Sequence, residues 1–280
     1  MSNRHQDYVA AAGYELSSPD ASRLLVLLHG LGGDRNQALG LIRGAALNDI
    51  AVLAPDARAH GATALVGEPS DFTFPAMVAD LLALIRATGQ AEKPTYIAGI
   101  SMGAALALHT VYTHALDLRG AGYIRPAFSH VPFPEHLKVM KVIAEILDQY
   151  GQEEGLHRFT ETVAYQTVAA ISPSGAASLR DQFTKPGVLE RSIRLAEIPR
   201  NTAFDSAQSQ EGKVLPALIV GTPGDPVHPL LLAENWAAQL PHAKFVQVPS
   251  RDDDPVAYEK GIQAAVLSHV KQAFQPDTIQ

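Results

Sequence analysis

The chain contains no cysteine, which excludes disulfide bonds, thiolate metal sites and catalysis by a thiol. It also lacks any stretch approaching the roughly 18 consecutive apolar residues of a membrane-spanning helix. No long basic run is present and the net charge is −7, so we expect neither nucleic acid nor a membrane as a partner. Residues 1–7 are polar and lack the apolar core of a signal peptide, so we expect a soluble cytoplasmic protein.

The length of 280 residues and the hydrophobic fraction of 46% are enough to bury a large core. Short, nearly continuous apolar runs alternate with runs at helical spacing, as expected for parallel strands covered on both faces. The runs that predict strands are Leu24–His29, Ala51–Pro55, Tyr96–Ile100, Gly122–Ile124, Ala217–Gly221 and Phe245–Val248. Those that predict helices are Phe74–Thr88, Met102–Leu118, Pro229–Gln239 and Pro255–Phe274. This alternation predicts an α/β fold with a mostly parallel, doubly wound sheet, preceded by a short antiparallel segment within Tyr8–Leu16.

One interval is too long for a simple crossover between parallel strands, namely the one between Arg125 and Ala217. This interval contains apolar residues at helical spacing and two signals for the start of a helix, Ser172-Pro173 and Lys185-Pro186. The apolar residues form one stripe at Leu137, Met140, Ile143, Ala144 and Leu147, and a second at Phe159, Val163 and Val168. We therefore predict a helical cap over residues 131–204, inserted into a core made of residues 1–130 and 205–280.

A predicted strand-to-helix junction carries the pattern Gly-x-Ser-x-Gly, as Gly99-Ile100-Ser101-Met102-Gly103. The apolar run Tyr96–Ala98 precedes it and the helix-like run Ala104–Leu108 follows it. In such a tight turn only small residues fit two positions before and after the serine, whose hydroxyl projects above the sheet. The pattern predicts Ser101 as a nucleophile, and the alternative is a serine that only the fold retains.

A glycine-rich loop, His29-Gly30-Leu31-Gly32-Gly33, follows the first long predicted strand, where backbone N–H groups can face a developing oxyanion. With Pro55–Gly61 and Gly224–Pro229, these motifs resemble the α/β-hydrolase fold over essentially the whole chain. The resemblance implies that Ser101 is the nucleophile and that the backbone N–H groups of Leu31 and Met102 hold the oxyanion. It also implies that Asp225, after the penultimate strand, is the acid that supports a base.

The loop Val248–Pro255 stands where the resemblance implies a catalytic histidine, and it contains none. The next histidine, His269, lies inside the final predicted helix, which Asp254-Pro255 begin as N-cap and first residue. A positioned general base typically contributes about 10²–10⁴ in rate, so the base has to be sought elsewhere. Our first choice is His228, three residues after Asp225, and the next is His130, where the chain enters the helical cap.

Each of these residues also has a structural interpretation. Asp225 can cap the following helix, His228 can simply open it, and His130 can be a solvated residue of the cap. Arg125 ends an apolar strand, where a charge is costly unless it is paired or faces a ligand. It either binds a substrate carboxylate or pairs with Asp225 or with the acidic run 252–254.

The sequence predicts a serine-dependent hydrolase of a small ester, thioester or related carbonyl substrate, without metal or organic cofactor. The chain could form a homodimer. We expect His29 and His60 to be structural, and Arg251 with its neighbouring aspartates to form a solvated turn and helix cap rather than a calcium loop. Two alternatives remain from other classes. One is a non-hydrolytic enzyme of the same fold (a lyase, decarboxylase or cyclase), and the other is a ligand-binding protein.

Overall fold

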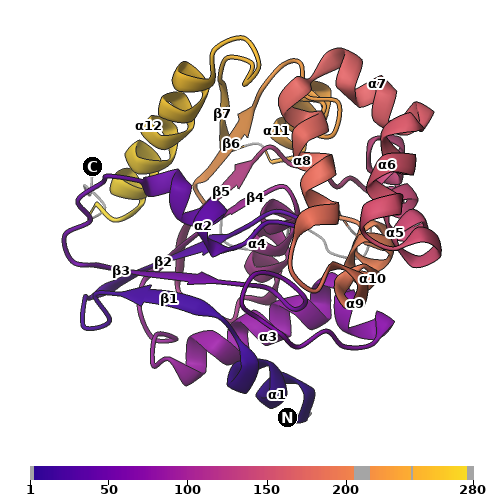
Figure 1. Cartoon of the computed structure of the whole chain (residues 1–280). Helices are drawn as coiled ribbons and strands as arrows, with labels where there is room; N and C mark the ends of the chain where they lie inside the picture. Colours follow the sequence, from indigo (N-terminus) through magenta and orange to yellow (C-terminus); the bar gives the residue numbers. More distant parts are fainter. Residues whose placement is uncertain (1–2, 205–214, 241, 276–280) are drawn as a thin grey trace.

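The computed structural model describes residues 3–204, 215–240 and 242–275. A seven-stranded sheet with the order β1-β3-β2-β4-β5-β6-β7 forms its centre (Figure 1). The strands are β1 (Tyr14–Ser17), β2 (Arg23–Leu28), β3 (Ile50–Pro55), β4 (Thr95–Ile100), β5 (Leu118–Ile124), β6 (Ala217–Gly221) and β7 (Ala243–Gln247). All neighbouring pairs are parallel except β1 with β3. The predicted α/β class with a mostly parallel, doubly wound sheet is confirmed.

Alternate side chains of each central strand enter two different cores. On β2, Leu24 and Val26 join one buried cluster, whereas Leu25 and Leu27 join the other. The first cluster is covered by α3 (Phe74–Ala87), α4 (Met102–Thr113) and α11 (Leu230–Gln239). The second is covered by α12 (Pro255–Ala273), α2 (Arg35–Leu39) and the short helix η1 (Gly40–Ile42). This burial on both faces explains why the strands read as continuous apolar runs.

Several element boundaries differ from prediction, and the largest differences concern the N-terminal segment and the end of α4. The antiparallel lead-in is confirmed only for β1, because Tyr8 lies in the helix α1 (Asn3–Ala11) and donates from its hydroxyl to the Asp56 carbonyl at 3.0 Å. The helix predicted to reach Leu118 ends at Thr113, because His114 takes a left-handed conformation with φ of 51°. Leu118 is instead the first residue of β5.

The described part of the segment between β5 and β6, up to residue 204, is mainly helical, as predicted. Its helices are α5 (Lys138–Tyr150), α6 (Glu153–Glu161), α7 (Val163–Ile171), α8 (Pro173–Thr184), α9 (Val188–Arg191) and α10 (Ile193–Glu197), with the 3-10 turns η3 (Glu135–Leu137) and η4 (Ile198–Arg200). A further 3-10 turn, η2 (Pro69–Phe72), precedes α3. We call α5–α10 the inserted helices. They lie together beside one end of the sheet (Figure 1). The first predicted stripe is buried throughout, from Leu137 to Leu147.

The second predicted stripe is only partly correct. Phe159 and Val168 are buried, but Val163 is 81% exposed, because Thr162 ends α6 and caps a new helix, α7. The start predicted at Lys185-Pro186 is also displaced, since α9 begins only at Val188. The division into a core and a separate cap stays a prediction, and residues 205–214 at its second boundary lie outside the described residues.

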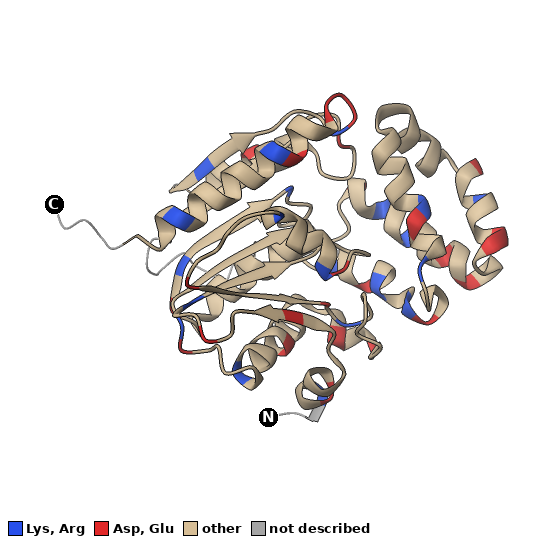
Figure 2. Ribbon diagram, turned by 60° about the vertical axis from the view of Figure 1, so that its left-hand side comes forward, with Lys and Arg blue, Asp and Glu red and all other residues tan. Residues whose placement is uncertain are grey.

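Acidic and basic positions are interspersed over the ribbon, and the acidic loop before α12 lies next to the inserted helices (Figure 2). Within the described residues, no helix is both long enough and apolar enough to cross a membrane.

Candidate active site

Ser101 occupies a strained turn between β4 and α4, with φ of 57° and ψ of −110°. The two flanking glycines are required by close approach of the backbone. A Cβ on Gly99 would overlap the carbonyl group of Gly103, and a Cβ on Gly103 would lie 2.5 Å from the Leu28 carbonyl oxygen. The Ser101 N–H donates to the Ile124 carbonyl at 2.9 Å, which ties the turn to β5. The turn is therefore fixed with its serine at the carboxyl edge of the sheet, where sites in open α/β sheets lie.

The loop Gly30–Gly33 beside this turn is held by several hydrogen bonds. The Gly30 N–H donates to Gln37 Oε1 at 2.8 Å, and the Gly33 N–H donates to the Gly30 carbonyl at 2.9 Å. From the inserted helices, Lys185 Nζ donates to the Gly32 carbonyl. Within the described residues, no hydrogen bond is recorded for the Leu31 N–H. Its N–H is thus available to a ligand.

Met102 contributes to the site only through its backbone. Its side chain is fully buried, whereas its N–H belongs to the first residue of α4 and has no acceptor within that helix. Leu31, by contrast, lines the cavity described next.

A cavity of about 190 Å³ opens on Ser101. Its floor is formed by the glycine-rich loop, the Ser101 turn and the loop after β6, which carries Asp225 and His228. Its opposite wall comes from the inserted helices, including Met140 of α5 and Ser178 of α8. Ser101 itself is 8% exposed. The cavity is large enough for a small organic molecule, and both polar and apolar side chains line it.

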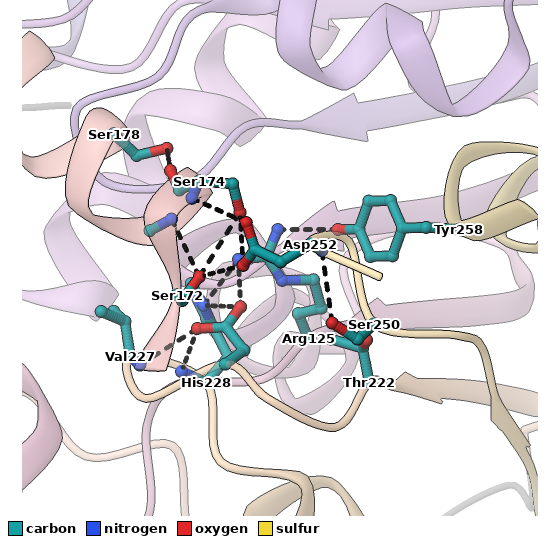
Figure 3. Close-up of polar contacts among 12 residues, drawn as sticks. Arg125, Ser172, Ser174, Ser178, Thr222, Val227, His228, Ser250, Asp252 and Tyr258 are labelled. Atoms are coloured by element: carbon teal, nitrogen blue, oxygen red, sulfur yellow. Dashed lines mark hydrogen bonds and ion pairs between the residues drawn. The ribbon is translucent and has the colours of Figure 1, made fainter. Parts of the chain in front are cut away.

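Asp225, His228 and Arg125 form one contact cluster in the wall of this cavity (Figure 3). Asp225 Oδ2 accepts from Arg125 Nη2 at 2.6 Å and lies 3.0 Å from His228 Nδ1. Asp225 Oδ1 accepts from the backbone N–H groups of Val227 and His228, both at 3.0 Å. Arg125 Nη1 donates to the Tyr258 hydroxyl at 2.8 Å. Arg125 therefore pairs with Asp225, which was one of its two predicted roles, and much of its guanidinium is occupied.

The charges in the cluster shift the pKa values of two of its members. For Asp225, burial raises the pKa, but the charges of His228 and Arg125 and the hydrogen bonds from His228 outweigh it and hold the pKa well below its usual range. For His228, burial lowers the pKa, and the charges of Arg125 and His136 lower it further against the opposing effect of Asp225. The carboxylate is therefore charged and the imidazole is neutral near pH 7.

The acidic loop after β7 contacts the inserted helices, a contact that sequence reasoning missed. Asp252 Oδ2 accepts from the Ser172 hydroxyl at 2.5 Å and from the Ser174 hydroxyl at 3.1 Å, and Oδ1 accepts from the Ser174 N–H at 2.8 Å (Figure 3). Asp254 caps α12 as predicted, accepting from the Ala257 N–H at 2.8 Å. The loop in which a histidine was sought thus binds the N-terminus of α8 instead.

The fold and the turn around Ser101 agree with the protein family that the sequence matches. A family model described as "Alpha/beta hydrolase family" matches residues 25–259. The chain belongs to the alpha/beta hydrolase family. No curated protein matches it.

Solved structures similar to this alpha/beta hydrolase span nearly its whole length. MGS-M2, an alpha/beta hydrolase enzyme from a Medee basin deep-sea metagenome library, has a TM-score of 0.71 at 19% identity and covers 96% of this chain and 97% of its own. A thermophilic esterase from Thermogutta terrifontis has a TM-score of 0.68 at 19% identity, covering 94% of each chain. The enol-lactonase from Burkholderia xenovorans LB400 has a TM-score of 0.67 at 17% identity, covering 93% and 96%. At these identities the likeness shows the fold alone.

The structure of this alpha/beta hydrolase does not bring every predicted site residue to the cavity. His130 is exposed and lies outside the cavity lining. His29 is buried, accepts from the Ala57 N–H at Nε2 and therefore donates from Nδ1 to the Gly30 carbonyl. His60 is buried as well and packs against His29, with ring centroids 4.8 Å apart and the rings tilted by 48°. Both positions fit the structural role expected for them.

Two further results concern what the described residues lack. They contain no group of three or more side chains arranged to hold a metal ion. Across the same residues, no hydrogen bond joins the Ser101 hydroxyl to a histidine. In this part of the chain the serine hydroxyl therefore has no preformed bond to a base.

Proposed function

We propose that the protein is a serine-dependent hydrolase of a small ester, thioester or related carbonyl compound. The observation that carries the proposal is the Ser101 turn, whose positive φ and tightly packed glycines hold the serine at a cavity. Backbone strain of this kind persists only where the surrounding structure imposes it. The names of an esterase and an enol-lactonase among the similar structures point to the same class of substrate.

In the proposed reaction, Ser101 Oγ attacks the substrate carbonyl carbon and forms an acyl-enzyme, and the alcohol or thiol leaves. Water then releases the acyl group as an acid and regenerates Ser101. The N–H groups of Leu31 and Met102 stabilise the negative charge that develops on the carbonyl oxygen in both steps. Among the described residues, neither of these N–H groups has a protein acceptor, which is what the role requires.

His228 is our candidate for the general base. Its Nδ1 lies 3.0 Å from the Asp225 carboxylate, an acid–histidine pair of the kind that orients a base. It also lines the cavity that contains Ser101. In this assignment Asp225 is the supporting acid, and its capping bonds to the backbone of residues 227 and 228 fix its orientation.

A fluorophosphonate probe with a fluorescent tag tests the nucleophile directly. We expect the wild-type protein to be labelled and Ser101→Ala to remain unlabelled, with hydrolysis of 4-nitrophenyl butyrate lost in parallel. Thr110→Ser serves as a control, because Thr110 lies far along α4 and its hydroxyl only bonds the Leu106 carbonyl. Labelling that persists in Ser101→Ala, or no labelling and no ester hydrolysis by the wild type, would overturn the proposal.

Replacing the candidate base tests the second part. His228→Asn should lower kcat for 4-nitrophenyl butyrate by about 10²–10⁴, the usual contribution of a general base. In this variant the fluorophosphonate probe should still label Ser101 specifically, but more slowly than in the wild type. Unchanged turnover would remove His228 from the mechanism while leaving the nucleophile intact.

One observation favours a second candidate function, a non-hydrolytic enzyme or ligand-binding protein of the same fold. Arg125 Nη2 lies within hydrogen-bond distance of both Asp225 and His228. It therefore competes with the hydrogen bond between Asp225 and His228 that would prepare His228 to activate Ser101. A protein of this kind would bind small carbonyl compounds without releasing an acid. Thermal stabilisation by such compounds without release of an acid would identify it.

A further inference from the structure

Lys185 differs from the other charged side chains that line the cavity. It is partly buried, its Nζ donates to the Gly32 carbonyl, and within the described residues it forms no ion pair. Burial lowers its pKa and the charge of Arg194 adds to this, whereas the charges of Asp34 and Asp181 oppose it. An ammonium group partly removed from water and without a carboxylate in direct contact is costly, so its position at a ligand cavity calls for an explanation.

The remaining charged residues of the cavity wall are paired or exposed. Asp225 is bound by Arg125 at 2.6 Å, which neutralises both. Asp252 accepts three hydrogen bonds from the N-terminus of α8. Arg251 and Asp181 are exposed and keep their contact with water. Among the described residues of the wall, Lys185 is thus the one cation that is both withdrawn from water and without a carboxylate.

Lys185 also has hydrogen-bonding capacity to spare. An ammonium group has three donors, and the Gly32 carbonyl accepts one of them. A carboxylate suits the others best, because it supplies an opposite charge together with its acceptor oxygens. Binding an anion would restore the electrostatic stabilisation that burial removes.

The position of Lys185 places such an anion close to the reacting carbonyl. Its hydrogen-bond partner, Gly32, directly follows Leu31, and consecutive Cα atoms are only ~3.8 Å apart. We propose that Lys185 binds a carboxylate of the substrate, so that the preferred substrates are esters or thioesters with a carboxylate a few carbon atoms from the reacting carbonyl. This inference rests on the proposed function, because it takes Leu31 as an oxyanion donor beside Ser101.

Two esters that differ only in charge test the inference. Monomethyl succinate carries the carboxylate, and methyl succinamate replaces it by a neutral amide of nearly the same shape. We expect the wild type to favour monomethyl succinate in kcat/KM, measured by chromatography of the products. Lys185→Met should reduce this preference about 10- to 100-fold, the range expected when a hydrogen bond to a charged group is lost. Lys185→Arg, which keeps the charge, should retain most of it.

The ratio of the two kcat/KM values separates binding of the carboxylate from a change in the Gly32 loop. A change in the loop would lower kcat/KM for both esters by the same factor and leave their ratio unaltered. Lys138→Met is the matched control, because Lys138 lies on the same inserted helices but is exposed and paired with Glu135. Its preference should equal that of the wild type. If the wild type hydrolyses both esters without this preference, or if the preference is unchanged in Lys185→Met, the inference is overturned.

A binding measurement keeps this test independent of catalysis. Calorimetric titration of Ser101→Ala with succinate should show binding that weakens about 10- to 100-fold when Lys185→Met is added. Succinate that binds the double variant as tightly as Ser101→Ala overturns the inference even if ester hydrolysis is confirmed. Conversely, loss of binding in the double variant supports the carboxylate site even if wild-type protein hydrolyses no ester, in which case only the proposed function fails.

Discussion

Arg125 Nη2 lies 2.7 Å from His228 Nδ1, so a cationic donor faces the nitrogen that would normally bind the supporting acid. If Nδ1 accepts from Arg125, the proton of the neutral imidazole lies on Nε2, which then cannot take a proton from Ser101. If Nδ1 instead donates to Asp225, Nε2 is free to act as a base. Arg125 and Asp225 thus favour opposite tautomers of His228.

Removing the arginine should strengthen His228 as a base. Arg125 lowers the pKa of His228, so Arg125→Met raises it, although burial continues to act in the other direction. A base acts only when unprotonated, so kcat/KM falls as the pH drops through this pKa. We therefore expect the acid-side midpoint of kcat/KM for 4-nitrophenyl butyrate to move to higher pH in Arg125→Met, measured between pH 5 and 9.

Arg251→Met is the matched control, because Arg251 also lines the cavity but is exposed. Its pH profile should coincide with that of the wild type. Arg125→Lys should lie between the two, since a lysine keeps the charge but loses the forked geometry. An acid-side midpoint in Arg125→Met that stays in place or moves to lower pH would show that His228 is not the base.

The turn around Ser101 could be predicted from the sequence because its requirements are local. The two glycines are required because backbone atoms a few residues away or on the adjacent strand leave no room for a side chain. The flanking apolar runs identify the strand and the helix. The place of Asp225 after β6 is instead implied by the resemblance to the α/β-hydrolase fold, which puts the acid after the penultimate strand.

Contacts between distant segments could not be predicted in this way. Asp252 and Ser172 are 80 positions apart, and their hydrogen bond depends on where α8 packs against the loop after β7. Likewise, nothing near Lys185 in the sequence indicates that its ammonium reaches the Gly32 carbonyl. The position of the inserted helices decides both contacts, and no local pattern encodes that position. For this reason the sequence alone identified neither the general base nor the residues that contact the substrate.

A methyl group at Gly99 should disrupt the turn. The added Cβ would overlap the Gly103 carbonyl, which belongs to the backbone of α4 and cannot rotate away. We expect Gly99→Ala to lower the free energy of unfolding by about 2–3 kcal/mol, as in other overpacked cores, and to reduce ester hydrolysis more than about 100-fold. Urea denaturation and 4-nitrophenyl butyrate hydrolysis measure the two effects.

Gly40→Ala is the control for this change. Gly40 has φ of −54° and the nearest atom to an added Cβ is the mobile end of Arg43 at 3.8 Å, so alanine fits without strain. Both stability and activity should stay close to wild type. If Gly99→Ala behaved like Gly40→Ala, the backbone around Ser101 would not have the tight geometry described above.

The hydrogen bonds of Asp252 should protect the start of α8 from opening. Asp252→Ala removes the acceptor of the Ser174 N–H and of two serine hydroxyls. Because one hydrogen bond contributes about 1 kcal/mol, amide hydrogen exchange at Ser174 should accelerate at least about fivefold. Asp253→Ala, which changes the exposed neighbour, should leave this exchange rate unaltered. Equal rates in the two variants would mean that Asp252 does not hold α8.

The buried, neutral His60 should make the protein less stable as the pH falls. Burial lowers its pKa well below 6.5, and the charges of Arg194 and His29 act in the same direction. Below pH 6.5 the unfolded chain therefore binds a proton that the native state excludes, and stability is lost progressively from that pH downward. For one such histidine the loss between pH 7.5 and 5.5 is at most about 1.4 kcal/mol.

His60→Asn should remove most of that contribution, because asparagine does not titrate and its amide can replace the Nδ1 donor to the Arg58 carbonyl. Urea denaturation at pH 7.5 and 5.5 gives the difference in unfolding free energy for each protein. We expect this difference to be about 1 kcal/mol smaller in His60→Asn than in the wild type, whatever the absolute stability of the variant. In His130→Asn, which alters an exposed histidine, the difference should match the wild type. A difference as large in His60→Asn as in the wild type would show that His60 already carries its proton in the native state, or that other groups produce the acid sensitivity.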